Sequence, residues 1–136
     1  MKYLLLCLVL LLVPTTQAAD TFVHVGMWSQ HLDGRQGRNQ THDLLGIEYE
    51  DVLFAHFINS KKRHTYAVLN MRRDGVCSKG FCLGHAYGFF KGYRFGDYTG
   101  IVPMVLPLLS YNADTWGTDV ICVLDKVCSI QFRFRL

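Results

Sequence analysis

A histidine and a serine, His31 and Ser60, are the side chains whose chemistry could combine into a reaction. His31 follows a strand-like segment over 21–30, and Ser60 follows another over 52–58. A serine beside a histidine can be activated by transfer of its proton to the ring, and acyl transfer then needs only an ester and an acceptor hydroxyl. We therefore expect a site for acyl transfer if the fold brings the ends of these two segments to one rim.

Other polar residues are weaker candidates for a chemical role. Three histidines fall within apolar segments, at His24, His56 and His85. We expect them to be interior polar residues that are hydrogen-bonded to neighbours such as Glu48, rather than metal ligands. The chain has no G-x-S-x-G, no H-E-x-x-H and no Gly-rich phosphate loop, so no metal and no cofactor is expected.

Four of the five cysteines form two local pairs, Cys77 with Cys82 and Cys122 with Cys128. Each pair could bridge one hairpin near its turn in an oxidising compartment. A zinc site would favour tighter pairs, and the chain contains no C-x-x-C. We expect the two local disulfides, with other pairings or free thiols as the alternatives.

Eight strand-like segments, separated in most places by turn signals, must position these residues. They run over 21–30, 45–50, 52–58, 64–72, 81–90, 101–111, 118–124 and 128–136. Alternation in the first segment places Val23, Val25 and Met27 on one face. The opposite face of that segment receives His24 and Trp28.

The last segment alternates most clearly. One face carries Ile130, Phe132, Phe134 and Leu136, and the other carries Gln131, Arg133 and Arg135. This pattern fits the closing strand of a membrane barrel, with lipid on one side and a polar lumen on the other. It also fits a half-buried strand of a soluble β-sandwich.

The beginning of the chain favours the barrel. Met1–Ala18 has the features of a secretory signal peptide, because Lys2 precedes an apolar run that is too short to span a bilayer and small residues precede Ala19. The remainder is rich in apolar residues but has no run long enough for a membrane helix. We therefore predict an all-β protein, with one eight-stranded antiparallel transmembrane β-barrel over 19–136 in the outer membrane of a Gram-negative bacterium. A disulfide-linked secreted sandwich is the alternative.

Four segments carry a resemblance to a known family. They are HFINSKKRHTYA at 56–67, FCLGHAYG at 81–88, IVPMVLPLLS at 101–110 and QFRF at 131–134. The chain resembles the PagP family of lipid A palmitoyltransferases, which are eight-stranded outer-membrane barrels. The resemblance implies transfer of a fatty acyl chain from a phospholipid to lipid A. It also implies outer-membrane lipids and the barrel assembly machinery as partners, and the modest net charge of +3 gives no reason to expect nucleic acid.

The resemblance also implies a catalytic set. Ser60 falls on the family serine, Asn59 on its aspartate, and His31 is the nearest candidate for its histidine. Pro103 and Pro107 match prolines that interrupt hydrogen bonding in the wall and let lipid enter sideways, since proline cannot donate to the strand ladder.

Two departures leave other functions open. Asn59 cannot be ionised, and the amphipathic helix that precedes the barrel in the family is missing. If Asn59 is a weakened equivalent of the aspartate, Asn59→Asp should raise activity. The competing hypotheses are a non-catalytic barrel with a surface-binding or structural role, and a lipid A deacylase.

Overall fold

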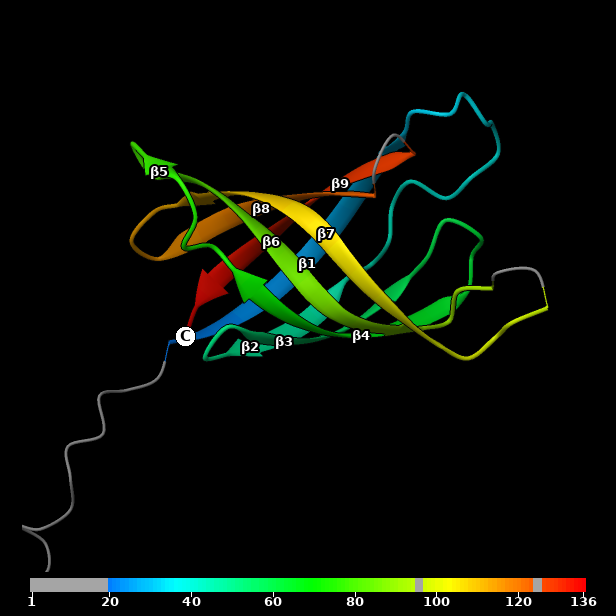
Figure 1. Ribbon diagram of the computed structural model, residues 1–136, viewed down its shortest axis with the longest axis horizontal. Helices are drawn as coiled ribbons and strands as arrows, with labels where there is room; N and C mark the ends of the chain where they lie inside the picture. Colours follow the sequence, from blue (N-terminus) through cyan, green and yellow to red (C-terminus); the bar gives the residue numbers. More distant parts are fainter. Residues whose placement is uncertain (1–19, 95–96, 124–125) are drawn as a thin grey trace, which may run out of the picture.

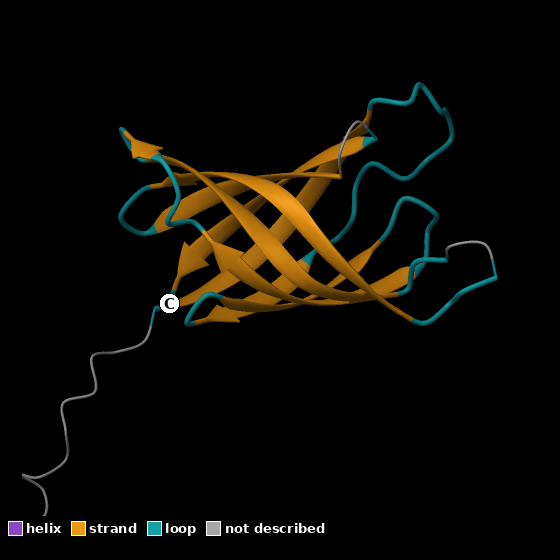
Figure 2. Ribbon diagram, in the orientation of Figure 1, coloured by secondary structure: helices purple, strands orange, loops and turns teal. Residues whose placement is uncertain are grey.

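The segments with alternating side chains form antiparallel strands, and these strands pair into one sheet that closes on itself (Figures 1 and 2). The computed structural model describes residues 20–94, 97–123 and 126–136. The strands are β1 (Thr21–His31), β2 (Leu45–Tyr49), β3 (Val52–Ile58), β4 (His64–Arg72), β5 (Cys77–Ser78), β6 (Phe81–Lys91), β7 (Ile101–Asn112), β8 (Trp116–Val123) and β9 (Val127–Arg135). Eight of them form the wall, because β4 pairs with β6 and so closes the sheet, while β5 only extends the start of β6. The predicted eight-stranded antiparallel barrel is confirmed.

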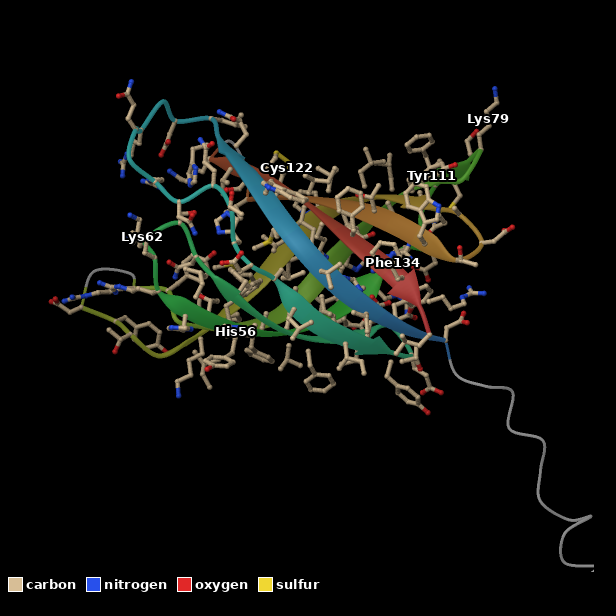
Figure 3. The ribbon with its side chains drawn as sticks, turned by 180° about the vertical axis from the view of Figure 1, so that it is seen from behind. His56, Lys62, Lys79, Tyr111, Cys122 and Phe134 are labelled. Carbon is tan, nitrogen blue, oxygen red and sulfur yellow. A yellow bond between two sulfur atoms is a disulfide. The ribbon has the colours of Figure 1, made fainter. Side chains whose placement is uncertain are left out.

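The two ends of the described chain lie at the same end of the barrel. The Leu136 amide donates to the Thr21 carbonyl at 2.9 Å, and β1 lies beside β9 (Figure 1). Figure 3 shows Lys62, in the connection after β3, at the opposite end from Lys79, which lies in the connection before β6. We call the end that carries Lys62 the loop end and the other the terminal end. The predicted signal peptide, Met1–Ala18, lies outside the described residues.

The wall separates two kinds of surface. Gln131 and Arg133 of β9 are buried inside, whereas Ile130 and Phe134 are exposed outside, as the alternation predicted. The exposed large apolar side chains of the strands are Trp28, Leu45, Ile47, Tyr49, Phe54, Tyr66, Val68, Phe81, Leu83, Tyr87, Phe89, Ile101, Val105, Leu109, Trp116, Ile130 and Phe134. Within the described part of the chain, no helix is long and apolar enough to cross a membrane.

The interior changes character along the barrel axis. Toward the terminal end it holds a buried polar cluster, whose members include Glu48, Arg73 and Asp119. Toward the loop end the buried side chains are mainly apolar, among them Phe57, Ala67 and Phe90.

A β-bulge in β1 corrects the faces that alternation predicted for this strand. The pairing of β1 with β9 shifts between Val25 and Met27, and Gly26 at the bulge has a φ of 63°, a conformation that glycine adopts at little cost. His24 is inside as expected, but Met27 is also inside, together with Ser29 and His31. The prediction that placed Met27 opposite His24 was wrong, since a bulge reverses the alternation beyond it. The bulge therefore turns Ser29 and His31 toward the interior.

Glycines of β6 and of the residue after it let this strand approach β4 closely. A Cβ atom at Gly84 would overlap the carbonyl oxygen of Arg72, one at Gly88 would overlap that of Val68, and one at Gly92 would overlap that of His64. These are contacts with backbone, which cannot move aside without breaking the β4–β6 pairing. Closure of the barrel thus depends on the absence of side chains at these positions.

We expect Gly84→Ala to prevent a stable closed barrel, because its methyl group would separate β4 from β6. The measurement is heat-modifiable migration on gels, which reports whether the barrel remains folded in detergent. His85→Ala on the exposed side of the same strand is the matched control and should fold normally. A Gly84→Ala protein that migrates as the wild type does would contradict this reason for the glycine.

Candidate active site

A cavity of about 370 Å³ occupies the loop end of the interior. Its volume lies within the range of about 300–1,000 Å³ that is typical of small-molecule sites. The apolar lining includes Met27, Leu44, Leu53, Ala55, Phe57, Ala67, Leu69, Phe90, Met104, Leu106, Ile121, Val123 and Val127. The polar lining comprises Ser29, His31, His42, Ser60, Ser129 and Gln131, together with five cationic residues and Tyr93. A long apolar chain with a polar group at one end matches this distribution.

The two residues singled out from the sequence meet at this cavity. His31 ends β1 and Ser60 follows β3, and His31 Nε2 lies 2.9 Å from Ser60 Oγ. His31 is 7% exposed, and its Nδ1 is buried without a hydrogen-bond partner among the described residues. The ring is thus positioned through Nε2 alone. The geometry brings the nucleophile-type group and the base within reach of each other, as acyl transfer requires.

Asn59 lies beside Ser60 in sequence, but its side chain is engaged elsewhere. Its Oδ1 accepts hydrogen bonds from the amides of Lys61 and Arg63 at 2.9 and 3.1 Å. Its Nδ2 donates to Thr65 Oγ1 at 3.0 Å and to the Gly92 carbonyl at 3.1 Å. The fully buried amide therefore holds the turn that carries Ser60, and none of these four hydrogen bonds involves His31.

These contacts change the expected result of Asn59→Asp from a gain of activity to a loss of stability. A carboxylate at this position cannot donate to the Gly92 carbonyl and would place negative charge against that oxygen in a buried site. We expect the free energy of unfolding to fall by roughly 1–3 kcal/mol, which denaturant unfolding in detergent micelles would measure. Higher activity with unchanged stability would instead support the role that the family resemblance implies.

A second serine–histidine pair lines the same cavity and was not found from the sequence. Ser29 Oγ lies 2.6 Å from His42 Nε2, and His42 Nδ1 lies 2.6 Å from the Ile58 carbonyl oxygen. Both side chains are buried. The Ile58 carbonyl oxygen can only accept a hydrogen bond, so His42 Nδ1 is the donor in that contact.

The loop between β1 and β2 becomes part of the wall where it carries His42. The His42 amide donates to the Met27 carbonyl at 2.9 Å, and the Ile58 amide donates to the His42 carbonyl at 2.8 Å. The Ser29 amide donates to the backbone carbonyl of Gln40 at 2.8 Å. This segment therefore bridges β1 and β3 where β2 does not reach, and it fixes the position of the His42 side chain.

Positive charge surrounds the mouth of the cavity. The five cationic residues of its lining are Arg35, Arg38, Lys61, Arg94 and Lys126. Asp33 lies near two of them, with Oδ2 at 3.5 Å from Arg35 Nε and 3.6 Å from Arg38 Nη2. Desolvation acts to raise the pKa of Asp33, but the Arg35 amide and the two guanidinium groups outweigh it and lower this pKa. The mouth can attract an anionic group.

The polar cluster closes the interior at the terminal end. Arg73 makes hydrogen bonds to both Glu48 oxygens, at 2.6 and 2.8 Å, and to both Asp119 oxygens, at 3.1 and 2.8 Å. Glu48 Oε2 also lies 2.7 Å from His24 Nε2, as we expected for that histidine. Gln131 joins this cluster to the cavity, with Nε2 3.3 Å from His24 Nδ1. The described residues of the cluster therefore lie between the cavity and the terminal end of the barrel.

The ladder between β7 and β8 is short on the side that carries the two prolines. Pairing with β8 runs from Leu108 to Asn112, whereas β7 pairs with β6 from Ile101 to Tyr111, which is all of the strand except its last residue. Pro103 and Pro107 are exposed on the outer face, in the part of β7 for which no β8 partner is described. A residue without an amide hydrogen fits such an edge.

The remaining residues singled out from the sequence are four cysteines and two histidines. Both local disulfides, Cys77–Cys82 and Cys122–Cys128, are confirmed. His85 is exposed, and His56 lies on the outer side of the barrel, 2.9 Å from His64 Nδ1 (Figure 3); the prediction that these two histidines face the interior was wrong. Across the described ranges, no group of three or more His, Cys, Asp or Glu side chains is placed to hold a metal ion.

Comparison with models of protein families and with curated proteins finds no match for this chain. The arrangement of the cavity, its two serine–histidine pairs and its cationic mouth is therefore the ground for a functional conclusion.

Proposed function

We propose that the protein is an outer-membrane acyltransferase of the PagP type, which moves a fatty acyl chain from a phospholipid to lipid A. The observation that carries this proposal is the cavity, because an apolar pocket inside the barrel leads to His31 and Ser60 under a cationic mouth. Burial of an acyl chain there would contribute about 0.8 kcal/mol for each methylene group. Both lipids carry phosphate groups, so the mouth would also attract their head groups.

The outer surface supports placement in a membrane. The exposed side chains of the wall are mainly apolar, and contiguous apolar surface of this extent is rare on soluble monomers. Trp28 lies toward the loop end of β1, and Trp116 begins β8 at the terminal end, which suits aromatic belts at two interfaces. The test is fractionation of cells that produce the protein. We expect it in the outer membrane, and recovery as a soluble periplasmic protein would reject this placement.

In the proposed reaction His31 acts as the general base. Nε2 takes the proton of the acceptor hydroxyl while that oxygen attacks the ester carbonyl of the phospholipid acyl chain. The new ester bond forms, the old carbon–oxygen bond breaks, and the proton passes to the leaving alkoxide. Before the reaction Ser60 contacts Nε2 at 2.9 Å. During it, the Ser60 hydroxyl turns to the ester carbonyl and so frees Nε2 for the acceptor proton.

A sideways path through the wall suits lipid substrates. The part of β7 that contains Pro103 and Pro107 lacks a described partner on its β8 side, and Met104 and Leu106 of this same stretch line the cavity. A lipid whose head group remains at the interface could pass its acyl chain between these strands. This is the role that we propose for the two prolines.

Incubation of the purified protein in detergent micelles with a phospholipid and lipid A tests the reaction. We expect lipid A to gain one acyl chain and the phospholipid to become a lysophospholipid. Loss of an acyl chain from lipid A would indicate a deacylase, in which water is the acceptor. No change in either lipid would favour the non-catalytic barrel.

The length of the transferred chain should depend on the depth of the cavity. Ala67 of β4 lines the cavity, and Ala67→Phe would fill part of it. We expect this variant to transfer shorter chains than the wild type, as measured by mass spectrometry of products from mixed-chain phospholipids. Val68→Phe, on the outer face of the next position, is the matched control. Equal chain selectivity in both variants would show that the acyl chain binds elsewhere.

A further inference from the structure

The pair formed by Ser29 and His42 has the geometry of an activated nucleophile. A carbonyl oxygen only accepts hydrogen bonds, so the 2.6 Å contact with Ile58 places the proton of the neutral ring on Nδ1. Nε2 is then the acceptor for the Ser29 hydroxyl at 2.6 Å. A nucleophile, a base and a third group that orients the base are thus joined by two hydrogen bonds, as in hydrolases with a serine–histidine pair.

The other two serines of the cavity lack this arrangement. Ser60 contacts His31, but nothing among the described residues holds a proton on the other nitrogen of that ring. Ser129 Oγ donates to the Ile121 carbonyl at 3.3 Å and has no described base beside it. Ser29 is therefore the serine whose proton has a prepared acceptor.

The position of Ser29 also suits an acyl substrate. It lies on β1 between Met27 and His31, which line the apolar part and the polar rim of the cavity. The bulge at Gly26 is what turns it inward, and bulges often re-aim side chains beside active sites. An acyl chain in the apolar part would bring its carbonyl group to the level of Ser29.

We propose that Ser29 is a nucleophile activated by His42, and that it holds the fatty acyl chain as an ester during transfer. This inference rests on the proposed acyltransferase function and divides its reaction into two steps. In the first, Ser29 Oγ attacks the ester carbonyl of the donor, its proton moves to His42 Nε2, and the donor carbon–oxygen bond breaks as that proton passes to the leaving alkoxide. In the second, the acceptor hydroxyl attacks the Ser29 ester and His31 takes the acceptor proton; the bond between the acyl carbonyl carbon and Ser29 Oγ then breaks, and that proton passes from His31 to the Ser29 oxygen, which leaves both histidines neutral.

A long-chain alkyl fluorophosphonate tests the nucleophile independently of lipid A. The activated serine oxygen forms a bond to phosphorus, the phosphorus–fluorine bond breaks, and fluoride leaves with the serine proton as hydrogen fluoride. The protein is labelled in detergent micelles, its intact mass is followed with time, and the labelled residue is located by peptide mapping. Heat-modifiable migration of each variant shows that the barrel is folded.

We expect one label on the wild type, located on Ser29. Ser29→Ala should abolish labelling, and His42→Gln, which keeps hydrogen-bonding capacity but not the base, should slow it by about 100-fold or more. Ser78→Ala, at an exposed serine of β5 that does not line the cavity, is the matched control and should be labelled at the wild-type rate. A label on Ser60, no label on folded wild type, or equal rates in wild type and His42→Gln would each overturn the inference.

The outcomes separate this inference from the proposed function. Labelling of Ser29 without any change in lipid A would support the nucleophile and reject the lipid A substrate. Acyl transfer to lipid A that persists in folded Ser29→Ala would support the proposed function and reject the acyl-serine step.

Discussion

Replacement of Arg73 by Met is expected to lower the free energy of unfolding by about 3–5 kcal/mol, because it leaves buried carboxylates without their cation. The Arg73 side chain is 12% exposed, and those of Glu48 and Asp119 are 2% and 0% exposed. Arg73 makes four hydrogen bonds to these two groups. Arg133 Nε lies 3.4 Å from Asp119 Oδ2, but within the described ranges Arg133 forms no ion pair with Glu48. Denaturant unfolding in detergent micelles would measure the loss.

The adjacent arginine is the matched control for this prediction. Arg72 pairs with Asp74, and both side chains are largely exposed. Such exposed pairs add little to stability because solvent screens them, so Arg72→Met should be close to the wild type. Equal stability of the two variants would show that the terminal end of the barrel does not depend on Arg73. Restoration of stability in a triple variant with Glu48→Gln and Asp119→Asn would confirm that unpaired charge is the cause.

Removal of His31 is expected to reduce acyl transfer by about 100-fold or more, since general base catalysis contributes effects of this size. Ser60→Ala should also reduce transfer, because among the described residues Ser60 is the hydrogen-bond partner of the His31 ring. If the two act as a unit, the double variant should resemble His31→Ala rather than show the product of two separate losses. Transfer of a labelled acyl chain in micelles is the measurement.

Gln30→Ala is the control for the His31 and Ser60 variants, because Gln30 precedes His31 on β1 and is exposed. It should fold and transfer acyl chains at the wild-type rate. Full activity of folded His31→Ala would reject His31 as the base. Full activity of folded Ser60→Ala alone would keep His31 as the proposed base and would reject a role for Ser60.

Much of the fold could be predicted because strand alternation and turn residues are local signals. The bounds of β3 and β4 agree with the predicted segments residue for residue, and both disulfides follow from local spacing. The closing strand β9 places Gln131 and Arg133 inside, as its alternation indicated. Such patterns can be read from a single strand without knowing which strands pair with it.

The candidate site could be predicted only in part, because its geometry depends on non-local packing. The ends of β1 and β3 were expected at one rim, and His31 and Ser60 do meet there. The bulge at Gly26 could not be deduced from alternation, and it determines that Ser29 faces the interior. His42 lies in a loop whose backbone completes the wall through Met27 and Ile58, and no local pattern marks such a segment. A glycine within an alternating strand was the one available signal for the bulge.

The mass of lipid A from cells with and without the protein tests the central claim most directly. Mass spectrometry should show that the wild type adds the mass of one fatty acyl chain to lipid A, and that folded His31→Ala in the same membrane does not. Identical lipid A masses with and without folded wild-type protein in the outer membrane would contradict the claim.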